Sequence, residues 1–170
     1  MHHRLDNFDL AVGYFPVLPD GLRSATLFRE SLACLAAADH PGIGEPMSLA
    51  QFAAAHHVVF GSPFSPLSTL EAMLDEVLRR IGVQRKLGMR VASVLLSPYV
   101  VAQTSLLAVL PLAFARHFAS FLPLRVQAAP FEAPSIDISM VWHERSHRLS
   151  MHHWVRGVVR QVVEEHVAGK

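Results

Sequence analysis

Residues 91–115 contain no charged side chain, and a run of that length could cross a membrane as a single helix. Pro98 and Pro111 would each interrupt such a helix, and Gln103 with its two polar neighbours would lie at its centre. No belt of aromatic or basic residues flanks the run. We therefore expect a buried part of a folded domain and no membrane segment.

Local signals divide this run into helix, strand and helix. A capping serine followed by Pro98 predicts a short helix that opens at Tyr99 and ends near Thr104. Residues 105–109 form an apolar run suited to a buried strand, and Pro111 begins a second helix. This alternation is typical of an α/β sheet, in which ligands bind beyond the strand ends, near helix N-termini.

The rest of the chain continues the same alternation. Helices are expected from Ser48, over 68–81 and over 150–167, because their apolar residues recur at helical spacing; Ser68 with Glu71 forms a capping box, and Gly82 follows as a stop. The last helix should carry one broad apolar face, made of Trp154, Val155, Val158, Val162 and Val163. Strands are expected over 8–13, over 25–37 as one or two strands, and over 57–60, 87–95, 124–128 and 136–142.

Composition limits the possible functions. The 170 residues are 51% hydrophobic with a formal net charge of +1, so the chain can bury a core but has no basic cluster for gripping nucleic acid by itself. One cysteine, Cys34, excludes an internal disulfide framework and favours a reducing cytoplasm. No secretory signal opens the sequence.

The motif His143-Glu144-Arg145-Ser146-His147 matches H-E-x-x-H, which binds zinc in metalloproteases when both histidines share one face of a helix. The residues before it alternate like a strand, and the next helix is expected only near 150. We therefore interpret it as a solvated connection, expect no metal or other cofactor, and keep a zinc hydrolase as an alternative.

Several segments together carry a family resemblance. They are FDLAVGYFPVLPDGLRSATLFRESLACLAAADHP, SLAQFAAAHHVVF, TSLLAVLP, IDISMVWHERSH and HHWVR, in this order. In this order and spacing they resemble the C-terminal effector-binding domain of LysR-type transcriptional regulators, closest to the aromatic-responsive branch that includes NodD and NahR. The resemblance covers nearly the whole chain.

The resemblance implies an α/β fold like that of periplasmic binding proteins, with two lobes and a small-molecule effector in the cleft between them. Lobe one would comprise residues 1–39 and 130–170, and lobe two residues 40–129. The amino-terminal winged helix-turn-helix, through which alone DNA would be bound, has no counterpart in the chain, and lobe one lacks its first elements. A homodimer or tetramer is implied.

No catalytic constellation is evident, so we expect a ligand-sensing domain and no enzyme. Three turns should face the effector, and their aromatic rings and helix N-termini suit an aromatic acid or phenol. A periplasmic-type solute-binding protein is the other alternative. The expected effector-binding residues are Tyr14, Phe15, Ser62, Phe64, Ser65, Tyr99 and Thr104.

Overall fold

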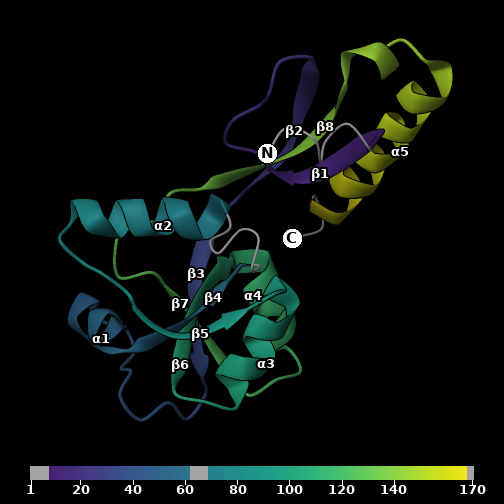
Figure 1. Cartoon of the computed structure of the whole chain (residues 1–170). Helices are drawn as coiled ribbons and strands as arrows, with labels where there is room; N and C mark the ends of the chain where they lie inside the picture. The colour runs from purple at the N-terminus through teal and green to yellow at the C-terminus, as the bar shows by residue number, and fades with distance from the viewer. Residues whose placement is uncertain (1–7, 62–68, 168–170) are drawn as a thin grey trace. The chain divides into compact units, whose positions relative to one another are not determined.

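The computed structural model describes residues 8–61 and 69–167, and the chain divides into two compact units (Figure 1). Unit 1 combines Met1–Arg29 with Ile136–Lys170, and unit 2 is Glu30–Ser135. Unit 1 contains β1 (Leu10–Tyr14), β2 (Leu22–Glu30), β8 (Ile136–His143), η3 (Glu144–Ser146) and α5 (Ser150–Val167). Unit 2 contains β3 (Leu32–Ala37), α1 (Leu49–Ala54), β4 (His56–Phe60), α2 (Thr69–Arg80), β5 (Lys86–Val91), η2 (Val94–Leu96), α3 (Ser97–Ala102), β6 (Leu106–Pro111), α4 (Leu112–Ala119) and β7 (Leu124–Ala128).

Unit 2 is built on a five-stranded sheet in the order β5-β4-β6-β3-β7. Strand β4 runs parallel to β5 and β6, whereas β3 is antiparallel to β6 and β7. All six residues of β3 are buried, which explains its continuous apolar sequence. Cys34 lies in this strand with no exposed surface, so it is an internal thiol.

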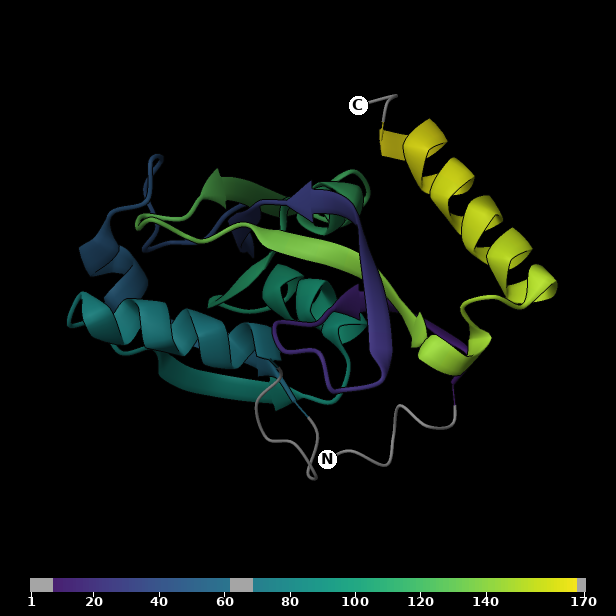
Figure 2. The same ribbon diagram turned by 90° about the horizontal axis from the view of Figure 1, so that it is seen from above.

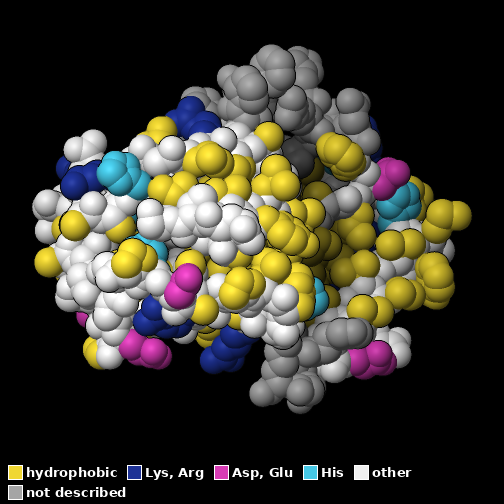
Figure 3. Space-filling model, turned by 90° about the horizontal axis from the view of Figure 1, so that it is seen from below, with side chains coloured by type: hydrophobic (Ala, Val, Ile, Leu, Met, Phe, Trp, Pro, Cys, Tyr) yellow, Lys and Arg dark blue, Asp and Glu magenta, His cyan; other side chains and the backbone are white. Residues whose placement is uncertain are grey.

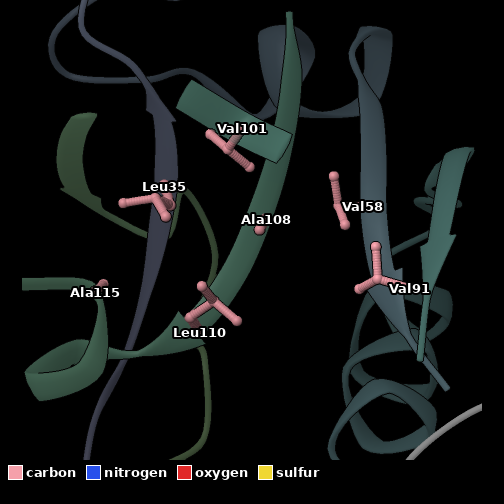
Figure 4. Close-up of a cluster of buried hydrophobic side chains, with 7 residues drawn as sticks. All are labelled: Leu35, Val58, Val91, Val101, Ala108, Leu110 and Ala115. Atoms are coloured by element: carbon pink, nitrogen blue, oxygen red, sulfur yellow. The ribbon is translucent and has the colours of Figure 1, made fainter. Parts of the chain in front are cut away.

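Helices lie on both faces of the sheet of unit 2. Helices α3 and α4 lie on one face, and α1 and α2 on the other (Figure 1 and Figure 2). The core on the first face is a cluster of side chains contributed by four strands and both helices (Figure 4). Its members are Leu35, Val58, Val91, Val101, Ala108, Leu110 and Ala115.

The uncharged run therefore folds as predicted from its prolines. Its first residue, Val91, is the last residue of β5. The residues that follow form η2, α3, β6 and the first part of α4, and Pro111 is the N-cap of α4. The strand expected over 87–95 is shorter than predicted, because it ends at Val91. Ser93 then accepts a hydrogen bond from the Leu95 amide and starts the 3-10 turn.

Capping signals set the ends of the helices. Ser48 and Gln51 form a complete capping box at α1. Gly82 ends α2 at a φ of 73°, and the amides of Gly82 and Val83 bond back to the carbonyls of Arg79 and Leu78. The capping box expected from Ser68 lies outside the described residues.

Unit 1 has a three-stranded sheet in the order β1-β8-β2, in which β1 and β8 are antiparallel. Tyr14 was expected in a turn, but it belongs to β1 because it pairs with Ile138. Pairing with a distant strand decides this boundary, and Gly13, the last residue of the expected strand, could not reveal it. Trp142 is buried in β8.

Helix α5 has the expected bounds, Ser150–Val167, and much of its apolar face is exposed in the described part of the chain. Trp154 is 67% exposed and Met151 is 75% exposed, whereas Arg156 is buried. Only part of the helix lies against the small sheet. Helical spacing therefore predicted the helix correctly, but it does not reveal how much of the apolar face is buried.

Candidate functional site

The candidate site is the edge of unit 2 at which the parallel strands β4, β5 and β6 end. The amide of Gly61 donates to the carbonyl of Val91 at 2.9 Å, which joins the ends of β4 and β5. Strand β6 ends at Pro111, and the Leu112 amide donates to the Ser31 carbonyl at 2.8 Å. Ligands of open α/β sheets bind at such carboxyl ends.

Tyr99 lies in the first turn of α3, which follows the carboxyl end of β5. Its ring packs edge-on against Phe118, with 5.7 Å between the ring centroids, yet the residue remains 50% exposed. A ring held from one side and open on the other can receive a planar ligand.

Thr104 is at the other end of α3. Its hydroxyl donates to the Val100 carbonyl at 2.8 Å and accepts from the Leu106 amide at 3.2 Å. The threonine thereby joins the C-terminus of α3 to the amino end of β6. The structure does not bring Thr104 and Tyr99 together, because they lie at opposite ends of the same helix.

The other expected site residues are divided between unit 1 and the undescribed part of the chain. Tyr14 and Phe15 lie at the carboxyl end of β1 in unit 1. Ser62, Phe64 and Ser65 lie outside the described residues. Their participation in a site remains a prediction.

Sequence reasoning missed a buried charged group behind the site. Glu71 of α2 accepts from the Phe60 amide at 3.2 Å, and its carboxylate lies 2.7 Å from the Arg85 guanidinium. Arg85 also bonds Asp75, and both side chains of the Arg85–Glu71 pair are almost fully buried. Burial raises the pKa of Glu71, while the charge of Arg85 opposes that rise.

This charged group ties the first turn of α2 to the end of β4. The sequence offered a signal: Arg85 stands close to Gly82 in a short loop, where it can turn back onto α2. A cavity of about 520 Å³ lies beside the loop. Its lining residues are Asp75, Arg79, Gly82, Val83, Gln84 and Arg85.

The H-E-x-x-H motif is not on an α-helix. His143 ends β8, and residues 144–146 form the 3-10 turn η3, as the alternating sequence before it indicated. Glu144 forms an ion pair with Arg23. His147 stacks on Trp142, and the indole N–H of Trp142 donates a hydrogen bond to Nδ1 of His147. Across residues 8–61 and 69–167, no group of three histidines, cysteines or carboxylates could hold a metal ion.

Trp142 and Arg156 belong to the segments IDISMVWHERSH and HHWVR, and the contact between them explains why these residues stand there. The guanidinium of Arg156 lies 4.8 Å from the centroid of the Trp142 ring and donates to the His147 carbonyl at 2.7 Å. These contacts fix the turn between β8 and α5. The motif residues therefore have structural roles in unit 1.

Comparison with known proteins defines the class. Residues 3–164 match the model of the LysR substrate binding domain, and the chain belongs to this family. It is an effector-binding domain of the LysR type, as the sequence motifs predicted.

Two transcriptional regulators are similar to this chain over most of its length. The transcriptional regulator SyrM of Rhizobium meliloti is 31% identical over 151 residues, which are 89% of this chain and 45% of SyrM. The transcriptional activator NahR of Pseudomonas putida is 29% identical over 148 residues, 87% of this chain and 48% of NahR. The chain thus spans about half the length of these relatives, and the match leaves the helix-turn-helix part of such regulators uncovered.

A solved structure confirms the fold. The effector-binding domain of QuiR in complex with shikimate superposes with a TM-score of 0.72 at 17% identity, over 95% of this chain and 74% of that domain. The fold is the mixed α/β, periplasmic-binding-protein-like fold of LysR regulatory domains, as expected. In the part of the chain that the structure describes, every helix is too short or too polar to cross a membrane.

Proposed function

We propose that this domain senses a small aromatic acid or phenol, and that binding controls transcription by a longer cytoplasmic regulator. The observation that carries the proposal is Tyr99, whose half-exposed ring lies in the first turn of α3, after the end of β5, and packs against Phe118. Membership of a regulator family supports a sensing role, and the shikimate bound by QuiR is a ring-shaped acid of the proposed size.

In this proposal the ligand ring stacks on Tyr99, and Phe118 supports that tyrosine from behind. The phenol hydroxyl of Tyr99 offers a hydrogen bond to a carboxylate or phenolate oxygen. Ser62, Phe64 and Ser65, which follow β4 in the sequence, are further proposed ligand contacts. Tyr14 and Phe15 of unit 1 stay predictions from the sequence.

The domain would act without catalysis. We infer that DNA binding belongs to a winged helix-turn-helix in the longer protein, and that the protein works as a homodimer or tetramer. The near-neutral charge of the chain supports the first inference, because sequence-selective binding by the domain alone would need a basic face. No observation favours the solute-binding protein or the zinc hydrolase over the regulator.

Ligand binding is tested by a thermal-shift screen over aromatic acids and phenols, followed by calorimetric titration of the best compound. A ligand that binds only the folded state must raise its stability. The Tyr99→Ala variant loses ring contact and a hydrogen bond, together worth about 1–3 kcal/mol, so affinity should fall roughly tenfold to a hundredfold.

Phe121 provides a matched control. It is 54% exposed and also packs on Phe118, with 5.3 Å between ring centroids, but it follows the C-terminus of α4 and does not belong to α3. The Phe121→Ala variant should bind as wild type does. Equal affinities of wild type and Tyr99→Ala would remove Tyr99 from the site.

A further inference from the structure

The cavity at the C-terminal end of α2 is lined by charged side chains of both signs. Its volume of about 520 Å³ lies within the range of roughly 300–1,000 Å³ that is typical of small-molecule sites. Asp75 and Arg79 of α2 line it together with residues 82–85 of the loop that follows, so the whole lining belongs to one segment of unit 2. Tyr99 does not line this cavity, which makes it separate from the proposed effector site.

Charge is gathered at this end of α2. On the face of the molecule shown in Figure 3, charged side chains lie singly or in small groups among hydrophobic ones. Residues 75–85, by contrast, carry five charged side chains, namely Asp75, Glu76, Arg79, Arg80 and Arg85. The way in which these groups pair with each other decides which charge each wall of the cavity presents.

Asp75 forms a negative wall. Its Oδ1 accepts two hydrogen bonds from Arg85, from Nε at 2.9 Å and from Nη2 at 2.7 Å. Arg85 also pairs with Glu71, so two carboxylates face one guanidinium and one negative charge is in excess. The side chain of Glu71 is buried, whereas that of Asp75 is 44% exposed and can offer Oδ2 to a cationic group. The C-terminus of α2 adds partial negative charge.

Arg79 forms a positive wall. Its Nε and Nη2 each donate to the Glu76 carboxylate at 2.9 Å. Arg80 donates to the same carboxylate at 3.0 Å, so two guanidinium groups share one carboxylate and one positive charge is in excess. Both arginines are exposed, but only Arg79 lines the cavity. Its Nη1 and the side-chain amide of the exposed Gln84 can donate to an anionic group.

We propose that this cavity binds a small zwitterion, an α-amino acid with an aliphatic side chain. The ammonium group would donate to Asp75, and the carboxylate would accept from Arg79 and Gln84. The aliphatic side chain would lie against Val83, next to the open space over Gly82, where no atom lies within 4 Å of a Cβ position. A ligand with one charge of each sign matches both walls, whereas one wall repels an ion that carries a single sign.

Calorimetric titration with L-leucine tests the proposal. Two analogues of the same shape each lack one charged group, because isoamylamine has no carboxylate and isocaproic acid has no ammonium. L-Leucine should bind at millimolar concentration or below, and each analogue should bind at least about tenfold more weakly, since it lacks charge-assisted hydrogen bonds. L-Leucine that does not bind at millimolar concentration overturns the proposal, and so does an analogue that binds as tightly as L-leucine.

Arg79→Ala and Arg80→Ala are a matched pair of variants. Both side chains are exposed, at 73% and 70%, and both pair with Glu76, so the two substitutions should change the stability equally little. Arg79→Ala should weaken L-leucine binding roughly tenfold, whereas Arg80→Ala should leave it unchanged. Equal affinities of wild type and Arg79→Ala, or equal losses in the two variants, overturn the proposal.

Asp75→Asn tests the negative wall. The substitution removes the charge but keeps an oxygen that can accept from Arg85, and it should also weaken L-leucine binding roughly tenfold. Circular dichroism checks that each variant is folded. Tyr99→Ala should bind L-leucine as wild type does, and a loss there equal to that in Asp75→Asn would contradict a separate site. A failure of the proposed effector at Tyr99 leaves the L-leucine titration unaffected, so the two proposals are tested independently.

Discussion

The two units use sheets in different ways. The five strands of unit 2 have helices on both faces, whereas the three strands of unit 1 have α5 as their only α-helix among the described residues. Only four of the buried hydrophobic residues found in the described chain belong to unit 1, namely Ile136, Met140, Val141 and Trp142. Removal of apolar surface from water is therefore concentrated in unit 2, and so is the stabilisation it provides.

Charges follow the same division. In unit 2 the Arg85–Glu71 pair is almost fully buried. In unit 1 the pairs Arg23–Glu144 and Arg29–Asp137 are exposed to water on both partners. Removing one partner of a buried pair leaves a buried charge without its counter-charge and strongly lowers the stability, whereas an exposed pair contributes little to the stability. We expect substitutions in unit 2 to dominate the stability of the chain.

The largest expected effect is at Arg85. The Arg85→Ala variant leaves the Glu71 carboxylate buried without its counter-charge, and the free energy of unfolding should fall by about 3–5 kcal/mol. Urea unfolding followed by circular dichroism measures it. In the same assay Arg23→Ala, which breaks the exposed pair with Glu144, should not shift the midpoint. Equal losses in the two variants would contradict the contrast between the units.

The second effect compares core residues. Leu110→Ala removes a side chain from the cluster of unit 2 and should cost about 2–5 kcal/mol. Val141→Ala makes a smaller cavity in the central strand of unit 1 and should cost about 1–2 kcal/mol. Both residues are almost fully buried, so burial alone does not separate them. Denaturant unfolding of the two variants measures both losses. A larger loss of stability in Val141→Ala than in Leu110→Ala would contradict the contrast between the units.

The third effect is a pH dependence located in unit 2. His57 has no exposed surface and packs on Phe52, and burial together with the charge of Arg85 lowers its pKa to about 4. The unfolded state, with a pKa near 6.5, binds the proton first, so stability is complete above pH 6.5 and declines toward pH 4. Between pH 8 and pH 5 the loss should be about 2 kcal/mol. Unfolding midpoints across this range should lose most of their slope in His57→Leu, and an unchanged slope would exclude His57 as the cause.

The smallest effect concerns the histidines of unit 1. The chelator EDTA should leave the unfolding midpoint unchanged, and His143→Ala combined with His147→Ala should cost no more than about 1 kcal/mol, from the lost stacking on Trp142. Thermal unfolding and metal analysis of the purified protein check both statements. Stoichiometric zinc that disappears in the double variant would contradict them.

Most element types were predictable because their signals are local. Ser48, Gly82 and Pro111 act within one turn of the chain, and the structure places each at a helix end. The alternating residues before His143 likewise revealed a strand where the motif alone suggested a zinc helix.

The errors arose where distant residues decide. Tyr14 joins a strand because of Ile138, and Glu71 is buried because Arg85 returns to it. The exposure of the apolar face of α5 depends on how much sheet lies beneath it, which helical spacing does not reveal. Of the expected site, the position of Tyr99 at the start of a helix was predictable from Pro98, whereas the hydrogen bonds of Thr104 to Val100 and Leu106 were not.

The position of the two tryptophans determines how this chain can be followed spectroscopically. Trp142 and Trp154 are the only tryptophans, and both belong to unit 1. Trp142 is 7% exposed beneath Arg156, whereas Trp154 faces solvent. Tryptophan emission therefore reports the unfolding of unit 1, while far-ultraviolet circular dichroism reports both units. Coincident transitions from the two signals would mean that the units unfold together, and separate transitions would give the stability of each unit in a single experiment.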